Sequence, residues 1–188
     1  MARWQPDALG RLQEAALELY AERGFEPTAV ADIAERAGLT ERTFFRYFAD
    51  KREVLFSGSE GLLEVMANAV AGAAASLTPI DTVAVALDAT AAFFTGRLEH
   101  ARRRQAVIDA NPSLQERELT KLASMAAAVA AALRGRGVSD PAAALAAEAG
   151  ISVFRSAFAR WIDESNERDL AELMRETLGA LKYVVAER

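Results

Sequence analysis

The 188-residue chain contains no cysteine and a single histidine, His100. The absence of cysteine excludes disulfide frameworks, thiolate zinc sites and thiol nucleophiles, and one histidine cannot form a histidine-rich metal site. His100 stands beside Glu99, with no serine–acid arrangement or metal motif around it. We therefore expect no catalytic residue, no metal ion and no cofactor, and the chain is not expected to be an enzyme.

Long apolar runs and helix-breaking residues are also scarce. No uncharged apolar run approaches the ~20 residues that a membrane span needs, and Met1–Asp7 lacks the apolar segment of a secretory signal. We expect a cytoplasmic protein with no membrane partner. Alanine, the best helix former, supplies 42 of the 188 residues, and no stretch alternates with period two over the length of a strand. The sequence thus predicts an all-α fold.

Apolar residues at helical spacing, bounded by glycine, proline and capping residues, predict about nine helices. They are expected at residues 7–23, 29–37, 41–48, 51–77, 81–98, 102–110, 113–134, 141–165 and 168–186. The weak point of the 51–77 helix is Ser57–Gly61, because each of its two glycines lowers helix stability by about 1 kcal/mol relative to alanine. Arg102, Arg103 and Arg104 are expected to form a solvated helix start.

The second and third predicted helices are joined by the tight turn Gly38-Leu39-Thr40, which is the arrangement of a helix-turn-helix unit. In such a unit the second helix lies in the major groove of DNA and leads with its N-terminal residues. Residues 41–48 would be this recognition helix. It would be about 12 Å long at about 1.5 Å per residue, so it can present few side chains to base pairs.

The segment Thr28–Lys51, extended to Leu55, closely resembles the DNA-binding segment of the tetracycline-repressor (TetR) family. The matching positions are Ala15, Ala16, Leu19, Gly24, Phe25, Val30, Ile33, Ala34, Ala37, Gly38, Leu39, Thr40, Thr43, Phe44, Phe45, Phe48, Lys51 and Leu55. The resemblance spans about the first 55–60 residues. It implies a three-helix DNA-binding domain over residues 1–50 and an all-helical ligand-binding and dimerisation domain over residues 51–188.

Side chains on and around the recognition helix are candidates for DNA contacts. Arg42 can bind guanine bidentately, with a solvated ion pair as the alternative, and Thr43 can touch a base or pack within the protein. Thr40 and Thr28 are expected to cap helices and to bind phosphates, and a phosphate would offset the unfavourable place of Lys51 at a helix start. The predicted DNA-binding residues are Thr28, Thr40, Arg42, Thr43, Phe45, Arg46, Tyr47 and Lys51.

Two of these positions depart from the family pattern. Phe45 stands where the family most often has a tyrosine whose hydroxyl reaches a phosphate, and phenylalanine cannot make that hydrogen bond. Tyr47 stands where the family often has histidine, and its hydroxyl can supply a phosphate contact from its own position.

The charge distribution favours DNA binding locally, although the chain as a whole is acidic. The net charge is −5, and residues 1–55 hold 8 basic and 10 acidic side chains. Residues 40–52, however, hold four basic side chains against two acidic ones, so the strip expected to face DNA has a net charge of +2. We expect modest non-specific affinity and a dependence on base contacts and on dimerisation.

The aromatic and apolar residues of the second domain fit two interpretations, an ordinary core or the wall of a ligand pocket. The candidate pocket residues are Leu62, Met66, Phe93, Phe94, Arg97, Met125, Phe154 and Phe158. Arg97, Asp88 and Arg155 are candidate polar anchors for a small effector that is apolar or aromatic. The 51–77 helix is expected to transmit the effector's signal, bending at Gly58 and Gly61.

Dimerisation is expected to use the last two helices, as the resemblance implies. The candidate interface residues are Ile151, Phe154, Phe158, Trp161, Ile162, Leu170, Leu173, Leu178, Leu181 and Val185. The sequence therefore predicts a ligand-responsive homodimeric repressor that binds a palindromic operator in double-stranded DNA. Two alternatives stay open: a helical scaffold or protein-interaction module that has lost DNA binding, and an enzyme.

Overall fold

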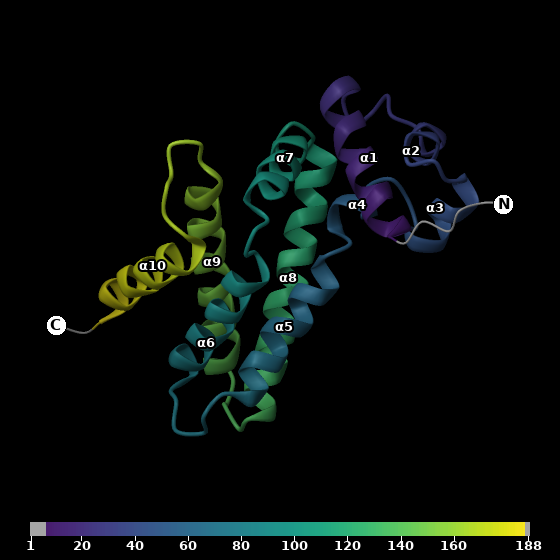
Figure 1. Cartoon of the computed structure of the whole chain (residues 1–188). Helices are drawn as coiled ribbons and strands as arrows, with labels where there is room; N and C mark the ends of the chain where they lie inside the picture. Colours follow the sequence, from purple (N-terminus) through teal and green to yellow (C-terminus); the bar gives the residue numbers. More distant parts are fainter. Residues whose placement is uncertain (1–6, 187–188) are drawn as a thin grey trace. The chain divides into compact units, whose positions relative to one another are not determined.

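The computed structural model describes residues 7–186, in which every regular element is a helix (Figure 1). The helices are α1 (Ala8–Arg23), α2 (Val30–Arg36), α3 (Glu41–Tyr47), α4 (Glu53–Phe56), α5 (Ser59–Gly72), α6 (Pro79–Phe93), α7 (Leu98–Asp109), α8 (Pro112–Gly135), α9 (Ala142–Ile162) and α10 (Leu170–Val185). The all-α prediction is confirmed for this part of the chain. The expectation about a secretory leader concerns residues that, apart from Asp7, lie outside the described range.

The chain forms two compact units. Within the described residues, the first unit contains the chain up to Gly58 together with Arg103–Glu118, which we call the hairpin tip because it joins α7 to α8. The second unit contains Ser59–Arg102 and the chain from Leu119 onward. The first unit therefore extends past the boundary predicted after residue 50. The reason is burial: apolar side chains of α4 and of the hairpin tip pack into the first unit's core.

The first unit is built around α1, which packs against α2 and α4, while α2 packs against α3. Asp7 begins α1 by accepting a hydrogen bond from the Gly10 amide at 2.8 Å. Arg11 on this helix donates to the carbonyl oxygen of Ala37 at 3.0 Å, at the point where α2 ends. Gly38 follows with φ +66°, a conformation that favours glycine. The predicted turn between α2 and α3 is thus present and held from α1.

The prediction of a single helix over residues 51–77 is wrong, because the structure has two helices there, α4 and α5. The break lies at Ser57 and Gly58, inside the predicted weak segment. The Ser57 hydroxyl donates to the Val54 carbonyl at 3.1 Å and accepts from the Gln13 side chain at 2.7 Å. These bonds compete with a continuing helical ladder, and Gly58 adds the low helix propensity of glycine.

The second unit contains an interhelical contact that depends on glycine. A Cβ atom at Gly150 of α9 would lie 2.5 Å from Cγ1 of Val83 on α6, so the two helices approach closely there. Among the described helices, α9 is the one whose length and mean hydropathy would suit a membrane span. Its buried side chains, however, belong to the core formed with α6 and α10. We therefore interpret α9 as a core helix.

Candidate DNA-binding surface

Helix α3 is fixed at both ends and on its inner face. The Thr40 hydroxyl accepts a hydrogen bond from the Thr43 amide at 3.2 Å, so the predicted helix-capping role of Thr40 is confirmed. Phe44 is fully buried and its ring packs on that of Phe48, with 5.2 Å between the centroids. One buried aromatic residue and one cap thus hold a seven-residue helix whose remaining side chains, apart from half-buried Thr43, are exposed.

Four of the eight predicted DNA-binding residues are exposed side chains of α3. Arg42 and Arg46 are exposed, and Phe45 and Tyr47 are exposed to 54% and 42%. The Arg46 guanidinium lies over the Tyr47 ring at 4.9 Å and donates to its hydroxyl at 3.1 Å. Two large aromatic side chains beside two arginines on one short helix form a surface suited to bases and phosphates.

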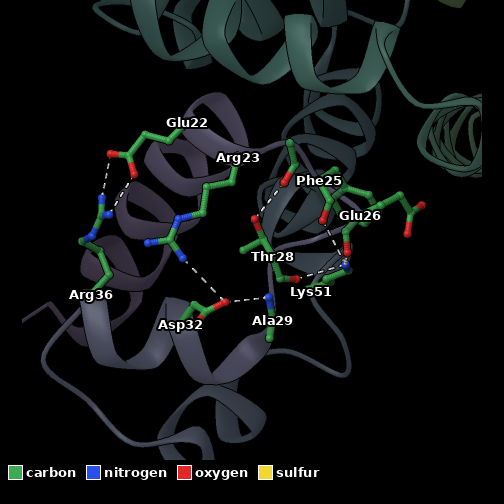
Figure 2. A network of polar contacts seen from close by, with 10 residues as sticks. Glu22, Arg23, Phe25, Glu26, Thr28, Ala29, Asp32, Arg36 and Lys51 are labelled. Atoms are coloured by element: carbon green, nitrogen blue, oxygen red, sulfur yellow. Dashed lines mark hydrogen bonds and ion pairs between the residues drawn. The ribbon is translucent and has the colours of Figure 1, made fainter.

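The predicted capping role of Thr28 is wrong, and its predicted phosphate contact stays a prediction. Thr28 is only 1% exposed, and its hydroxyl donates to the Gly24 carbonyl at 2.7 Å (Figure 2). The residue before α2 is Ala29, whose amide donates to the Asp32 carboxylate at 3.1 Å. At the start of α2 it is Asp32, inside the helix, that accepts from a backbone amide, and Thr28 does not.

Lys51 points into the protein. Its ammonium donates to the carbonyl oxygens of Phe25, Glu26 and Thr28 at 2.9, 2.9 and 3.1 Å, and it lies 4.5 Å from the centroid of the Phe25 ring (Figure 2). The main-chain carbonyl of Lys51 accepts a 2.7 Å hydrogen bond from the hydroxyl of buried Tyr20. Burial raises the pKa of Tyr20, and the charge of Asp50 raises it further. Helical periodicity places Tyr20 on the apolar face of the first helix but does not reveal the partner of its hydroxyl.

The basic strip at residues 40–52 is partly neutralised within the protein. Arg52 forms an ion pair with Asp50 at 2.6 Å, and Asp50 also accepts from the amides of Arg52 and Glu53. The Arg52 side chain and these amides hold the pKa of the Asp50 carboxyl below its usual range, against the effect of partial burial. The pattern Asp50-x-x-Glu53, typical of a helix start, is the sequence signal that points to this role.

The three consecutive arginines do not form a solvated helix start. In the second unit, Arg102 donates to the carbonyls of Ile162 and Asp163 at 2.9 and 2.8 Å, at the end of α9. In the first unit, Arg103 pairs with Glu14 of α1 at 2.6 Å. Each of these side chains therefore satisfies groups on another helix, which periodicity along the sequence cannot reveal.

The hairpin tip holds α4 in the first unit through Arg104 and Arg117. Arg104 donates to the Leu55 carbonyl at 2.7 Å, pairs with Glu118 at 3.0 Å, and lies 5.1 Å from the centroid of the Phe56 ring. Arg117 donates to Glu53 at 2.8 Å. Helix α4, only four residues long, is thus bound at its first and third residues by the hairpin tip.

The predicted pocket residues lie together in the second unit. Leu62, Met66, Met125 and Phe154 are buried in one core, and Phe93, Phe94 and Phe158 pack against it. The Phe94 ring contacts the rings of Phe93, Phe154, Phe158 and Trp161, with centroids 5.4–6.0 Å apart. The Arg97 guanidinium lies 4.4 Å from the centroid of the Phe93 ring, and Asp88 pairs with Arg175 at 3.3 Å.

Six of the ten predicted dimer-interface residues are core residues of a single subunit. They are Ile151, Phe154, Trp161, Leu170, Leu173 and Leu178, all of which are buried. Phe158, Ile162 and Leu181 are half-buried against the same core, and Val185 is exposed. An apolar stripe indicates that a helix face is buried, but it does not identify the element that buries it. Here α6, α9 and α10 pack against one another.

Family models match both parts of the chain. The model of bacterial regulatory proteins of the tetR family matches residues 12–57, and the model of the MftR C-terminal domain matches residues 77–186. The chain is 29% identical over 177 residues to a protein of Mycobacterium tuberculosis (strain ATCC 25618 / H37Rv) designated mycofactocin biosynthesis transcriptional regulator MftR, covering 93% of this chain and 87% of that protein.

Solved structures share the fold. FadR from Bacillus subtilis, solved in complex with stearoyl-CoA, superposes with a TM-score of 0.63 at 20% identity, covering 92% of this chain and 96% of that one. Thermus thermophilus FadR, a transcriptional repressor solved in complex with lauroyl-CoA, gives 0.55 at 24% identity, covering 96% of each chain. Together with the two family models, these findings show that the chain belongs to the tetR family of bacterial transcriptional regulators.

Proposed function

We propose that the protein is a cytoplasmic, homodimeric and ligand-responsive repressor that binds an inverted-repeat operator through α3. The observation that carries the proposal is the exposed face of α3, where two arginines and two aromatic side chains project from a helix that Thr40 caps and Phe44 anchors. A dimer would place two such helices in successive major grooves, with half-site centres about 34–36 Å apart or a multiple of that distance.

The side chains of α3 take different roles in this proposal. Arg42, near the start of the helix, reads guanine through its two-pronged guanidinium. Thr43 and Phe45 make apolar contacts with a thymine methyl group or a sugar, and Arg46 and Tyr47 bind phosphates. Phe45 provides apolar contact area where family members more often have a tyrosine hydroxyl.

Dimerisation would use the outer faces of α9 and α10. Leu145 on α9 and Tyr183 and Val184 on α10 are exposed to 66%, 78% and 77%. Exposure of such large apolar side chains to water on two neighbouring helices is unfavourable. This supports the proposal that a second subunit buries them. These residues replace the six buried ones in the proposed interface.

The effector is proposed to be a small molecule with a long apolar part, and acyl thioesters of coenzyme A are the first class to test. Two FadR proteins with this fold were solved with stearoyl-CoA and lauroyl-CoA. In this chain, the predicted pocket residues supply apolar and aromatic surface in the second unit. An effector would act by binding more tightly to a conformation with low operator affinity.

The test begins with selection of binding sites from random double-stranded DNA by the purified protein. We expect an inverted repeat to be enriched and the Arg42→Ala variant to bind it more weakly by about 1–3 kcal/mol for each half-site, with specificity relaxed at one base pair per half-site. Arg134→Ala, which removes a half-exposed arginine of α8 that pairs with Asp140, is the matched control and should bind like the wild type. Failure to enrich any sequence would instead favour a helical interaction module.

A further inference from the structure

We propose that Lys51 is a positioning residue, which fixes the loop between α1 and α2 and ties it to the start of α4 instead of binding a DNA phosphate. The inference rests on the proposed operator binding through α3. The loop, Gly24–Ala29, leads directly into α2, and α2 packs against α3. The placement of this loop therefore affects the placement of the whole helix-turn-helix unit.

The first argument is the number of hydrogen bonds. An ammonium group has three N–H donors and no acceptor. The Lys51 ammonium has three acceptors, the carbonyl oxygens of Phe25, Glu26 and Thr28, all at 2.9–3.1 Å. Donation to a phosphate would require one of these bonds to break, and a carbonyl of the loop would then lose its charged donor. The structure thus assigns all three donors to the loop.

The second argument is that the contacts around Lys51 form a closed ring. Its ammonium lies over the face of Phe25, the Phe25 ring packs edge-on against Tyr20 at 5.2 Å, and the Tyr20 hydroxyl binds the Lys51 carbonyl at 2.7 Å. Thr28 closes the loop on itself through its bond to the Gly24 carbonyl. Figure 2 shows Lys51 at the meeting point of the three loop carbonyls. Both the main-chain carbonyl and the ammonium of Lys51 are therefore held by contacts within this ring.

The third argument is the place of Lys51 next to α4. This helix begins at Glu53, and the hairpin tip binds it through Arg117 and Arg104. A displacement of α4 would be passed to Lys51 through two peptide units and from there to the loop before α2. Lys51 is therefore placed to couple α4 to the helix-turn-helix unit, entirely within the first unit of the chain.

The first experiment uses the free protein without DNA. Lys51→Met keeps the length of the side chain and removes its donors, and Lys51→Arg keeps the charge in a planar group that does not fit three convergent oxygens. In both variants we expect the carbonyl ¹³C resonances of Phe25 and Thr28, read through the amides of Glu26 and Ala29, to shift upfield. Lys182→Met, which removes a lysine paired with Asp81 in the second unit, is the control and should leave them in place.

The second experiment measures operator affinity as a function of salt concentration. A direct phosphate contact from each subunit would reduce the salt slope of a dimer by about 1.8 when lysine is removed, and Lys51→Arg would retain affinity. We expect both variants to bind at least about tenfold more weakly, with a change in slope of less than about half that value. A variant that fails to fold is replaced by Lys51→Gln, which is assessed in the same way.

Either of two results would overturn the proposal: unshifted carbonyl resonances in the free variants, or a full loss of about 1.8 in the salt slope of Lys51→Met. Failure of operator binding by the wild type would be a separate result. It would contradict the proposed function, while the resonances of the free protein would still decide whether Lys51 holds the loop.

Discussion

We expect Tyr20 to make the free energy of unfolding depend on pH in the alkaline range. Its buried hydroxyl donates to the Lys51 carbonyl, and burial raises its pKa in the folded protein, with Asp50 contributing. A group whose pKa is raised on folding favours the folded state fully below its unfolded pKa, about 10 for tyrosine, and loses that effect as the pH rises above it. The free energy of unfolding should therefore fall above about pH 10.

The measurement is urea denaturation from pH 8 to 11. Tyr20→Phe should be about 1 kcal/mol less stable than the wild type at pH 8, because one buried carbonyl loses its donor. Its stability should then decline less steeply than that of the wild type at higher pH. Tyr47→Phe, at an exposed position of α3, serves as the control in this DNA-free measurement. Parallel curves for the wild type and Tyr20→Phe would show that the Tyr20 hydroxyl does not govern this pH dependence.

Single residues differ in how far their sequence context reveals their role. The Thr40 cap and the buried Phe44 follow from local rules, because a cap and an apolar stripe depend on neighbours a few positions away. The role of Lys51 depends on three backbone carbonyls about 25 residues earlier, which any residue types could supply. The sequence indicates that a lysine is present and not where its ammonium points.

Among the elements, α4 depends on partners that are distant in the sequence. A four-residue helix makes few hydrogen bonds of its own, and the carbonyl of Leu55 instead accepts from Arg104 of the hairpin tip. The position of the break between α4 and α5 could be predicted from Gly58. The contact that helps to hold this break could not be predicted, because the Ser57 hydroxyl accepts a hydrogen bond from Gln13 on another helix.

Removal of the Arg104 guanidinium should therefore release α4. Arg104→Met keeps the apolar stem but leaves the Leu55 carbonyl and Glu118 without this donor, so we expect a loss of about 1–3 kcal/mol in unfolding free energy. Amide hydrogen exchange in α4 should accelerate at the same time. Arg103→Met, whose pair with Glu14 is more exposed, should cost less than about 1 kcal/mol and leave α4 protected. Equal effects of the two variants would rule out a specific role for Arg104.

The assembly of the molecule is where sequence patterns were least informative. Helical periodicity identified the apolar stripes of α9 and α10, and burial assigned most of them to the subunit's own core. Helical periodicity does not indicate that the exposed Leu145 and Tyr183 belong to an interface. They nevertheless lie on the two helices in which the family resemblance places the dimer contact. A dimer face must be found by subtracting the residues that the core already uses.

The proposed dimer predicts a specific response to charge. A Leu145→Glu/Tyr183→Glu variant should sediment as a monomer and lose most of its operator affinity, because charges would have to be buried without partners at the interface. Leu119→Glu, at a residue of α8 that is 53% exposed, should remain dimeric. A double variant that still sediments as a dimer would place the interface elsewhere.

The discontinuous first unit has a consequence for protein engineering. Its core is completed by Val107, Ile108 and Leu114, which are translated about fifty residues after α4. During synthesis, the helix-turn-helix unit therefore cannot bury its full apolar surface until the hairpin tip has left the ribosome. For the same reason, a chimera that exchanges operator specificity by grafting residues 1–58 alone would pair a foreign α4 with the resident Arg104 and Arg117. Transplanting Arg103–Glu118 with the graft preserves the matched surfaces.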